Sequence, residues 1–436
     1  MTYFIYEGHE RRPFDLPKGW KLISYGQPAD AGQSYAPVSQ LTREALTHPL
    51  DGPSLSRSIG SAQTVAILTD DGARPTPVSE MLPSLLEVLS QSGVSREAID
   101  IVVSLGTHVP MERDALRQKI GKDLLETYRV IQHDCRAKDL VPVGRLKTGG
   151  EIRINRIAAQ ADVRIGLGSV FPHPMNGFGG GPKIIFPGIS NYEAIREHHL
   201  AWTPHEKSTF GITEENPFYQ EIFRIGKMGR LTYSLNCVFD IRDQVANVLL
   251  GSYEEVHRKG VNLSQQLCGI NIPEKSDVTL VSAYPYLEPL QVIKPLITGS
   301  LITKQGGTVI LVAKSTQRMP VTFVELFEKI GKDSQGRVKE FAVGKFRTNQ
   351  LLLENAAIDF NCALYYALVC KGDHRVVVVS KDLGKQEVER MGLVWYENLE
   401  VAILSERDRT PNATVNVLPM GGTTLPILPE GLRVTL

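Results

Sequence analysis

The sequence predicts an α/β protein of two domains, each with a largely parallel sheet flanked by helices, and a site in the cleft between them. Two observations carry this prediction. A chain of 436 residues is longer than one hydrophobic core usually serves, so two domains are expected. Short β-branched runs also alternate with longer amphipathic segments, which is the pattern of parallel sheets covered by helices.

Seven short apolar runs predict buried strands, because they are rich in Val and Ile and are bounded by turn residues. They occupy residues 64–68, 99–104, 162–167, 278–283, 308–313, 376–380 and 401–404. Leucines recur at helical spacing within residues 78–91, directly after the start signals Pro75 and Pro77. This segment is therefore predicted to be a helix that joins the first two strands.

A domain boundary is expected near residues 270–275, where a polar stretch with a proline separates a helical segment from a new strand. We therefore divide the chain into domains 1–270 and 271–436. The first 60 residues are rich in Pro, Gly and Ser. They are interpreted as a strand, a turn and an irregular cover.

Composition excludes several classes of protein. The 48 basic and 48 acidic residues are interspersed and give zero net charge, so no nucleic-acid partner is expected. The five cysteines form no CxxC pair, which argues against a disulfide framework and indicates a reducing cytoplasm. The N-terminus lacks the apolar core of a signal peptide, and no run approaches a membrane span, so neither export nor a membrane partner is expected.

Polar residues follow the first three predicted strands. Asp71 and Arg74 follow the first, His108 the second and His173 the third. Ligands in open α/β sheets bind beyond the carboxyl ends of the strands, so these side chains are candidates for one site. The alternatives are a solvated turn for Asp71 and Arg74, and a capping role for His108.

A glycine cluster at residues 177–181 leads to Lys183. Bare backbone there could approach an anion, although the segment is neither a Walker loop nor a dinucleotide fingerprint. A flexible loop with an exposed lysine is the alternative. His198 and His199 follow on a predicted helix, where they point about 100° apart, so one at most is a ligand. With His108 and His173, the neighbourhood suits zinc or nickel.

Gln291 and Lys294 are three residues apart, after the predicted strand at 278–283. At the start of a helix they would share one face, which could hold a carboxylate. The alternative is a solvated helix start with an extended lysine.

Taken together, five motifs resemble the lactate racemase family over nearly the whole chain. They are DDGARP at 70–75, SLGTHVPM at 104–111, PHPMNGFGGGPKIIFPG at 172–188, the histidine pair of EHHLAW at 198–199, and QVIK at 291–294. Each is weak alone, but their order and spacing are specific, with His173 ten residues before Lys183 and Lys183 sixteen before His199.

The resemblance implies a nickel-pincer nucleotide, a nicotinate-derived mononucleotide whose two thiocarboxyl groups clamp nickel. It implies that domain 1–270 binds this cofactor and carries the catalytic groups, with Lys183 as the covalent tether and His199 as the nickel ligand. Separate cofactor-synthesis enzymes would be maturation partners. The resemblance also implies cofactor contacts from Asp71, Gly72, Ala73 and Arg74.

The implied activity is that of a racemase or epimerase, an isomerase that inverts C2 of a 2-hydroxy acid by proton-coupled hydride transfer. The resemblance makes His108 and His173 the acid/base pair, a role that suits imidazole near neutral pH. It assigns the substrate carboxylate to Arg74, Gln291 and Lys294. Because these groups come from both domains, domain closure is expected to complete the site.

The sequence departs from lactate-specific members at two places. Leu290 stands where those members place an aromatic residue, and no Trp lies between Trp202 and Trp395. The expected substrate is therefore lactate-like or a larger 2-hydroxy acid, such as a malate-like diacid or a sugar acid.

Two further interpretations stay open from sequence. One is a zinc-dependent hydrolase or lyase using His108, His173 and His199, with Asp71 as the nearby carboxylate. The other is a nucleotide sensor, which leaves both strand-end histidines without a role. The oligomeric state is not encoded in any pattern of the sequence.

Overall fold

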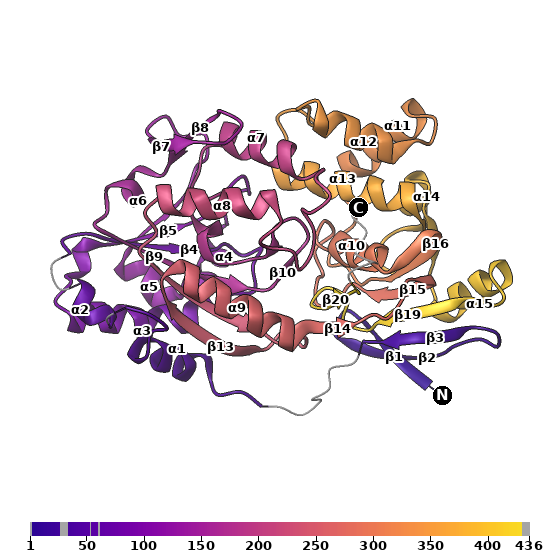
Figure 1. The fold of residues 1–436 in the computed structure, drawn as a ribbon, viewed down its shortest axis with the longest axis horizontal. Helices are drawn as coiled ribbons and strands as arrows, with labels where there is room; N and C mark the ends of the chain where they lie inside the picture. The colour runs from indigo at the N-terminus through magenta and orange to yellow at the C-terminus, as the bar shows by residue number, and fades with distance from the viewer. Residues whose placement is uncertain (1, 27–33, 53, 60–61, 430–436) are drawn as a thin grey trace.

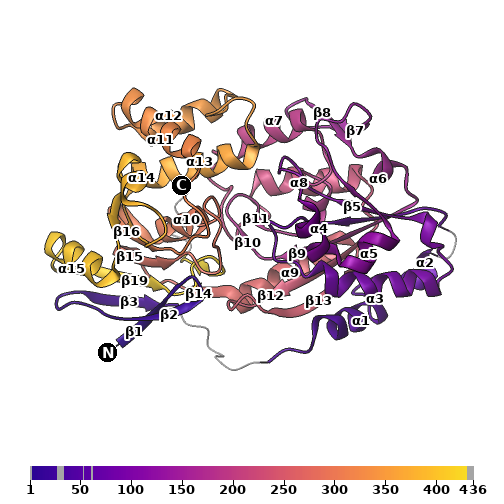
Figure 2. The same ribbon diagram turned by 180° about the vertical axis from the view of Figure 1, so that it is seen from behind.

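The computed structural model describes residues 2–26, 34–52, 54–59 and 62–429. It shows two α/β units side by side, one mostly indigo to magenta and the other mostly orange to yellow (Figures 1 and 2). The predicted fold class is confirmed, and six of the seven predicted strands are present. Within the described ranges, no helix is long and apolar enough to cross a membrane.

The first unit has a six-stranded sheet in which all neighbours are parallel except the outer pair β12 and β13. Its strand order is β13 (Val245–Gly251), β12 (Tyr233–Phe239), β9 (Val163–Val170), β4 (Val65–Thr69), β5 (Ile99–Val103), β6 (Arg129–Gln132). Both faces are covered by helices, so the central strands β4 and β9 are buried along their whole length.

Alternate strand residues pack against two helical layers. One core contains Val65 and Ile67 of β4, and the other contains Ala66 and Leu68. The helices and short elements of this unit are α1 (Val38–Thr47), α2 (Leu55–Ile59), α3 (Val78–Gln91), α4 (Arg113–Ile120), α5 (Lys122–Thr127), β7 (Val141–Arg145), β8 (Glu151–Ile154), α6 (Arg156–Gln160), α7 (Tyr192–Trp202), α8 (Pro217–Met228) and α9 (Tyr253–Cys268). Helix α3 has the predicted bounds.

The second unit has a six-stranded sheet that is parallel throughout. Its strand order is β18 (Val394–Tyr396), β17 (Arg375–Val379), β16 (Thr303–Val312), β15 (Ser276–Ser282), β19 (Thr414–Leu418), β3 (Lys21–Tyr25). The accompanying elements are the hairpin β1 (Thr2–Glu7) and β2 (Glu10–Asp15), and helices α10 (Ile293–Leu301), α11 (Val321–Asp333), α12 (Val338–Arg347), α13 (Ile358–Asp373), α14 (Lys385–Arg390) and α15 (Leu399–Arg409).

The start of the chain lies outside the unit in which the division 1–270 would place it. Strand β3 pairs with β19 of the second sheet, and Trp20 packs into the core of that sheet while its indole N–H donates to Thr410 O at 2.9 Å. The reason is that β19 offers a free edge to a parallel strand, and pairing satisfies the main-chain groups of both. At residue 270 itself, β14 (Gly269–Asn271) pairs with β20 (Leu425–Ile427).

The strand predicted at residues 401–404 is wrong, because this run lies inside helix α15. Asn398 caps the helix by accepting hydrogen bonds from the main-chain N–H groups of Glu400 and Val401. Ala402 and Ile403 are buried on one face. An apolar run of four residues fits a helix as well as a strand, and the cap decides between them.

The position of Trp20 gives a test of this assignment. We expect Trp20→Ala to lower the free energy of unfolding by about 3–5 kcal/mol, because a buried indole leaves a cavity. Urea denaturation followed by circular dichroism measures the change. The exposed Val321→Ala serves as the control and should stay within about 0.5 kcal/mol of the parent. An equally small effect of Trp20→Ala would contradict the assignment of the N-terminal segment to the second core.

Candidate active site

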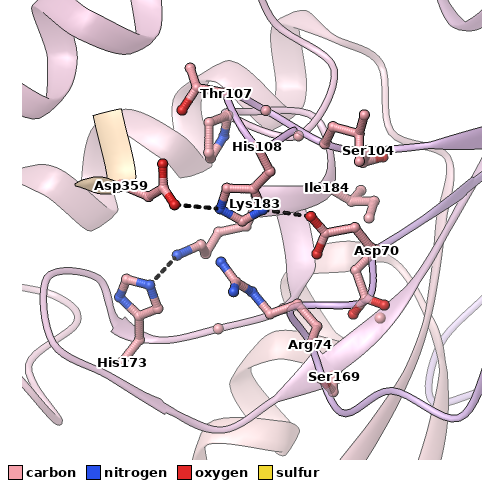
Figure 3. A pocket seen from close by; sticks show the side chains of 18 of the residues that line it. Asp70, Arg74, Ser104, Thr107, His108, Ser169, His173, Lys183, Ile184 and Asp359 are labelled. Carbon is pink, nitrogen blue, oxygen red and sulfur yellow. Dashed lines mark hydrogen bonds and ion pairs between the residues drawn. The ribbon is translucent and has the colours of Figure 1, made fainter. Parts of the chain in front are cut away.

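The carboxyl ends of β4, β5 and β9 meet at one cavity of about 130 Å³. Strand-end loops bring the predicted residues there, and Lys183 and His199 come from the short helix η2 (Gly181–Ile184) and from α7. Figure 3 shows the Lys183 amine directed towards His173, with His108 opposite. The predicted residues that line this cavity are Asp71, Arg74, His108, His173, Lys183 and His199.

Asp71 fixes the orientation of His108. Its Oδ2 lies 2.5 Å from His108 Nδ1, and its Oδ1 accepts from the main-chain N–H of Ala73. Burial alone would raise the pKa of Asp71, but the hydrogen bond and charge of His108, with the charge of Arg74, outweigh it and lower that pKa. A charged Asp71 accepts the Nδ1 proton of His108, which leaves Nε2 as a proton acceptor.

The loop that carries Asp71 and Arg74 is held by a buried ion pair that sequence analysis missed. Lys119 Nζ lies 2.7 Å from Asp70 Oδ1 and donates to the main-chain oxygens of Arg74 and Thr76. Burial raises the pKa of Asp70, and Lys119 opposes this shift. A lysine on helix α4 carries no sequence signal for this role, because the contact spans more than forty residues.

His173 and Lys183 form a close contact, with 2.9 Å between His173 Nε2 and Lys183 Nζ. His173 Nδ1 accepts hydrogen bonds from the main-chain N–H groups of Met175 and Asn176. A nitrogen that accepts carries no proton, so the proton of the neutral ring is on Nε2 and is donated to Lys183. The Lys183 amine therefore accepts, and it is uncharged.

The charge environment agrees with this assignment. Burial, followed by the positive charges of Arg74 and Lys294, holds the pKa of Lys183 well below its ordinary value. Burial, followed by the charge of Lys183, likewise holds the pKa of His173 well below its ordinary value. Lys183 is thus a neutral amine, which is the nucleophilic form.

The two neighbouring histidines of α7 have different surroundings. His199 lines the cavity and its Nδ1 donates to the main-chain oxygen of Ile195 at 2.8 Å. Burial is the main cause that lowers its pKa to about 3, so the ring is neutral. Within the described residues no hydrogen bond is made to its Nε2 lone pair, and this is the form that binds metals. His198 packs against the rings of Phe186 and Phe218, away from the cavity.

The glycine cluster lines the cavity, but its missing side chains serve packing as well. A Cβ on Gly180, whose φ is +79°, would lie 2.7 Å from Ser169 O, and one on Gly181 would lie 2.9 Å from His257. The N–H of Gly181 donates to Asn236 Oδ1, and His257 Nε2 donates to Gly179 O. The loop before Lys183 is therefore held rigidly, unlike the flexible loop of the alternative interpretation.

A second cavity of about 560 Å³ adjoins the first, and Gly72, Ala73, Arg74 and Gln291 line it. Lys294 Nζ lies 4.9 Å from the centre of the ring of Tyr286, a residue that lines this second cavity. Burial, followed by the charge of Arg74, lowers the pKa of Lys294 to about 7. Gln291 precedes helix α10 instead of lying in it, so the predicted shared helix face is wrong.

Asp359 is a site residue that sequence analysis missed. It lies in the first turn of α13 and lines both cavities. Its Oδ2 lies 3.7 Å from His108 Nε2, and Figure 3 marks this contact with a dashed line. No motif surrounds it in the sequence, and only the packing of the second unit against the first places it at the site.

The described residues do not favour the zinc alternative. No group of three or more His, Cys, Asp or Glu side chains within them is placed to hold a metal ion. His108 and His173 are instead engaged with Asp71 and Lys183.

Comparisons with known proteins point to one family. Residues 8–211 match the model of the lactate racemase N-terminal domain. The chain is 28% identical over 314 residues to a lactate racemase from Thermoanaerobacterium thermosaccharolyticum, covering 70% of this chain and 73% of that protein. It is 26% identical over 279 residues to a lactate racemase from Lactiplantibacillus plantarum, covering 63% and 65% respectively.

Two solved structures share the fold. The lactate racemase apoprotein from Thermoanaerobacterium thermosaccharolyticum superposes with a TM-score of 0.83 at 23% identity, covering 99% of this chain and 100% of that one. A Thermotoga maritima protein superposes with a TM-score of 0.66 at 19% identity, covering 90% and 98%. The two-unit fold is thus shared with the first protein over nearly the whole chain and with the second over most of it.

The neutral state of Lys183 can be tested by labelling. An unperturbed lysine, with a pKa near 10.4, gains about tenfold in amine reactivity per pH unit between pH 7 and 9, because its neutral fraction grows by that factor. We expect the rate at Lys183 to rise less steeply over this range, since its pKa is well below the ordinary value. Isotope-coded acetylation and peptide mass spectrometry measure both rates. A tenfold rise per unit at Lys183 would contradict the assignment.

Proposed function

We propose, from its similarity to lactate racemases, that this chain inverts the configuration at C2 of a 2-hydroxy acid with a nickel-pincer nucleotide tethered to Lys183. The observation that carries this proposal is that one cavity is lined both by the Lys183 amine, which accepts a hydrogen bond from His173, and by His199, whose Nε2 has no hydrogen-bond partner within the described residues. A neutral amine is needed to form the covalent bond, and a neutral imidazole is needed to bind the metal.

The donor set fits such a cofactor. Lys183 would hold it covalently, His199 would bind the nickel, and the loop from Asp71 to Arg74 would contact it from the end of β4. The chemistry that the bound group supplies is reversible acceptance of a hydride. The chain's own task is then to bind the substrate, hold it in place and move the hydroxyl proton.

The two strand-end histidines present opposite hydrogen-bonding groups to the cavity. His108 Nε2 is an acceptor because the Nδ1–H group donates a hydrogen bond to the charged Asp71, so His108 is positioned to receive the substrate's hydroxyl proton. His173 presents an Nε2 donor because its Nδ1 accepts from two main-chain N–H groups. Inversion by hydride transfer needs a group that accepts the hydroxyl proton and a donor that hydrogen-bonds the substrate oxygen. The pair provides both.

Arg74, Gln291 and Lys294 would hold the substrate carboxylate. Arg74 lines both cavities, and its loop is braced by Lys119. Gln291 Oε1 is buried without a hydrogen-bond partner within the described residues, and the Gln291 side chain also offers an amide donor. A charge-assisted clamp of this kind keeps the acid in place while its C2 centre is inverted.

The first test is loading. We expect protein co-expressed with cofactor-synthesis enzymes to carry an added covalent mass and about one nickel per chain, and to racemise a 2-hydroxy acid. Lys183→Ala should lack the added mass. His199→Ala should keep the mass but lose nickel, because the tether and the metal ligand are different side chains. Intact-protein mass spectrometry with metal analysis measures both.

A buried histidine away from the cavity supplies the matched control, since His198→Asn should keep both mass and nickel. An unmodified parent chain, under conditions that load a lactate racemase, would overturn the proposal.

The second test concerns the orientation of His108. We expect Asp71→Asn to lower kcat by about 10²- to 10⁴-fold with the cofactor mass still present, because an amide can donate to His108 Nδ1 and so favour the wrong tautomer. The double variant with His108→Ala should be no slower than His108→Ala alone, since both changes remove the same proton acceptor. Additive losses in the double variant would contradict this role for Asp71.

A further inference from the structure

The two cavities divide a bound substrate between them. They meet at Arg74, Phe171 and Asp359, which line both. The proton-transfer histidines line only the smaller cavity, whereas Gln291 lines only the larger one. A substrate whose carboxylate is held at Arg74 therefore places its reacting carbon in the smaller cavity and extends the rest of its chain into the larger one.

The larger cavity has room for a substrate tail, and its lining is acidic. Its volume of about 560 Å³ exceeds what a methyl group needs. Arg74 is the sole Lys or Arg among the described residues that line it, against four carboxylates. These are Asp240, Asp243, Glu288 and Asp359.

Two of the four carboxylates are already engaged. Asp240 is paired with Arg242 at 2.7 Å, and Glu288 accepts from the hydroxyl of Thr316 at 3.3 Å. Within the described residues, the ion pair of Asp359 is the 3.7 Å approach to His108, which is too long for a hydrogen bond, and its charge also raises the pKa of Lys294. Asp243 faces the same cavity from the β12–β13 turn. Asp243 and Asp359 thus present acceptor oxygens to whatever fills the space.

We propose that Asp359 and Asp243 are specificity-determining residues that select a 2-hydroxy acid with a polyhydroxylated tail, the aldonic acid class. The proposal rests on the proposed function and narrows its substrate. Asp359 accepts a hydrogen bond from a tail hydroxyl close to the reacting carbon, and Asp243 accepts one from a hydroxyl further along the tail.

Other tails fit this lining less well. An apolar tail would desolvate both carboxylates without giving them a partner, which is costly. A second carboxylate, as in a malate-like diacid, would meet like charges. An ammonium tail would be attracted by the acidic lining, but it would also lie beside the positive charge of Arg74 at the junction of the two cavities. Hydroxyl groups satisfy the acceptors without adding charge.

The experiment compares four acids on cofactor-loaded protein: gluconate, lactate, malate and a 2-hydroxy acid with an amino-bearing tail. Inversion at C2 is followed by chiral chromatography. We expect kcat/KM for gluconate to exceed that for each of the others at least tenfold. Calorimetric titration of the same acids into unloaded protein should give the same ranking of Kd, which supplies a readout independent of turnover.

Isosteric variants test whether Asp359 and Asp243 cause the preference for gluconate. Asp359→Asn and Asp243→Asn should each lower the gluconate-to-lactate preference about tenfold, mainly through KM, because each removes a charged acceptor but keeps the shape. Asn also tolerates the positive φ of 62° at position 243. The control is Glu354→Gln, an exposed carboxylate 3.6 Å from Arg196, which should leave the preference unchanged.

The outcomes separate the two proposals. A preference for lactate, malate or the 2-hydroxy acid with an amino-bearing tail overturns the proposed selection of a polyhydroxylated tail but leaves the proposed function intact. An unchanged preference in both variants overturns the roles of Asp359 and Asp243. Absence of inversion with every acid, in protein shown to carry the cofactor, removes the proposed function. In that case a tighter Kd for gluconate would still support the cavity assignment.

Discussion

The contact between His173 and Lys183 is the constraint on which the rest of the site depends. Two basic groups 2.9 Å apart cannot both be charged inside a protein, because burial and repulsion act together. The fold resolves this by making His173 Nδ1 an acceptor for two main-chain N–H groups. That requires a tight turn after the histidine, and Gly177, with φ of +75° and Ile212 O within 2.2 Å of any Cβ, completes it. The amine state of Lys183 is thus decided by backbone geometry.

At His108 a different partner of Nδ1 selects the opposite tautomer. There the partner of Nδ1 is a carboxylate instead of main-chain N–H groups, so the ring presents the opposite proton state to the cavity. One sheet edge therefore carries two imidazoles with complementary roles, although both follow strands of the same kind. Asp71 can do this only if its loop is fixed, and Lys119 fixes that loop through its contacts with Asp70 and the main chain.

The local sequence pattern encodes only part of this arrangement. Buried parallel strands appear as apolar runs, so β4 and β9 and the residues that follow them were predictable. Strand β3 was not, because its partner β19 lies almost four hundred residues away and nothing in the local pattern names it. Lys119 and Asp359 could not be predicted for the same reason, since each contacts site residues that are far away in the sequence. A four-residue apolar run, as in α15, is too short to distinguish the 3.6-residue repeat of a helix from the alternation of a strand.

The site is completed only where the two units touch. The N–H of Ile358 donates to Thr107 Oγ1 at 3.3 Å, which anchors the start of α13 beside the His108 loop and sets the position of Asp359. Lys294, from the other unit, has a pKa near 7 chiefly because it is buried. A carboxylate bound beside it favours the charged amine, so substrate binding takes up a proton above that pH and weakens as the pH rises. The positive charges of Arg74 and Lys294 are therefore the complement of an anionic substrate.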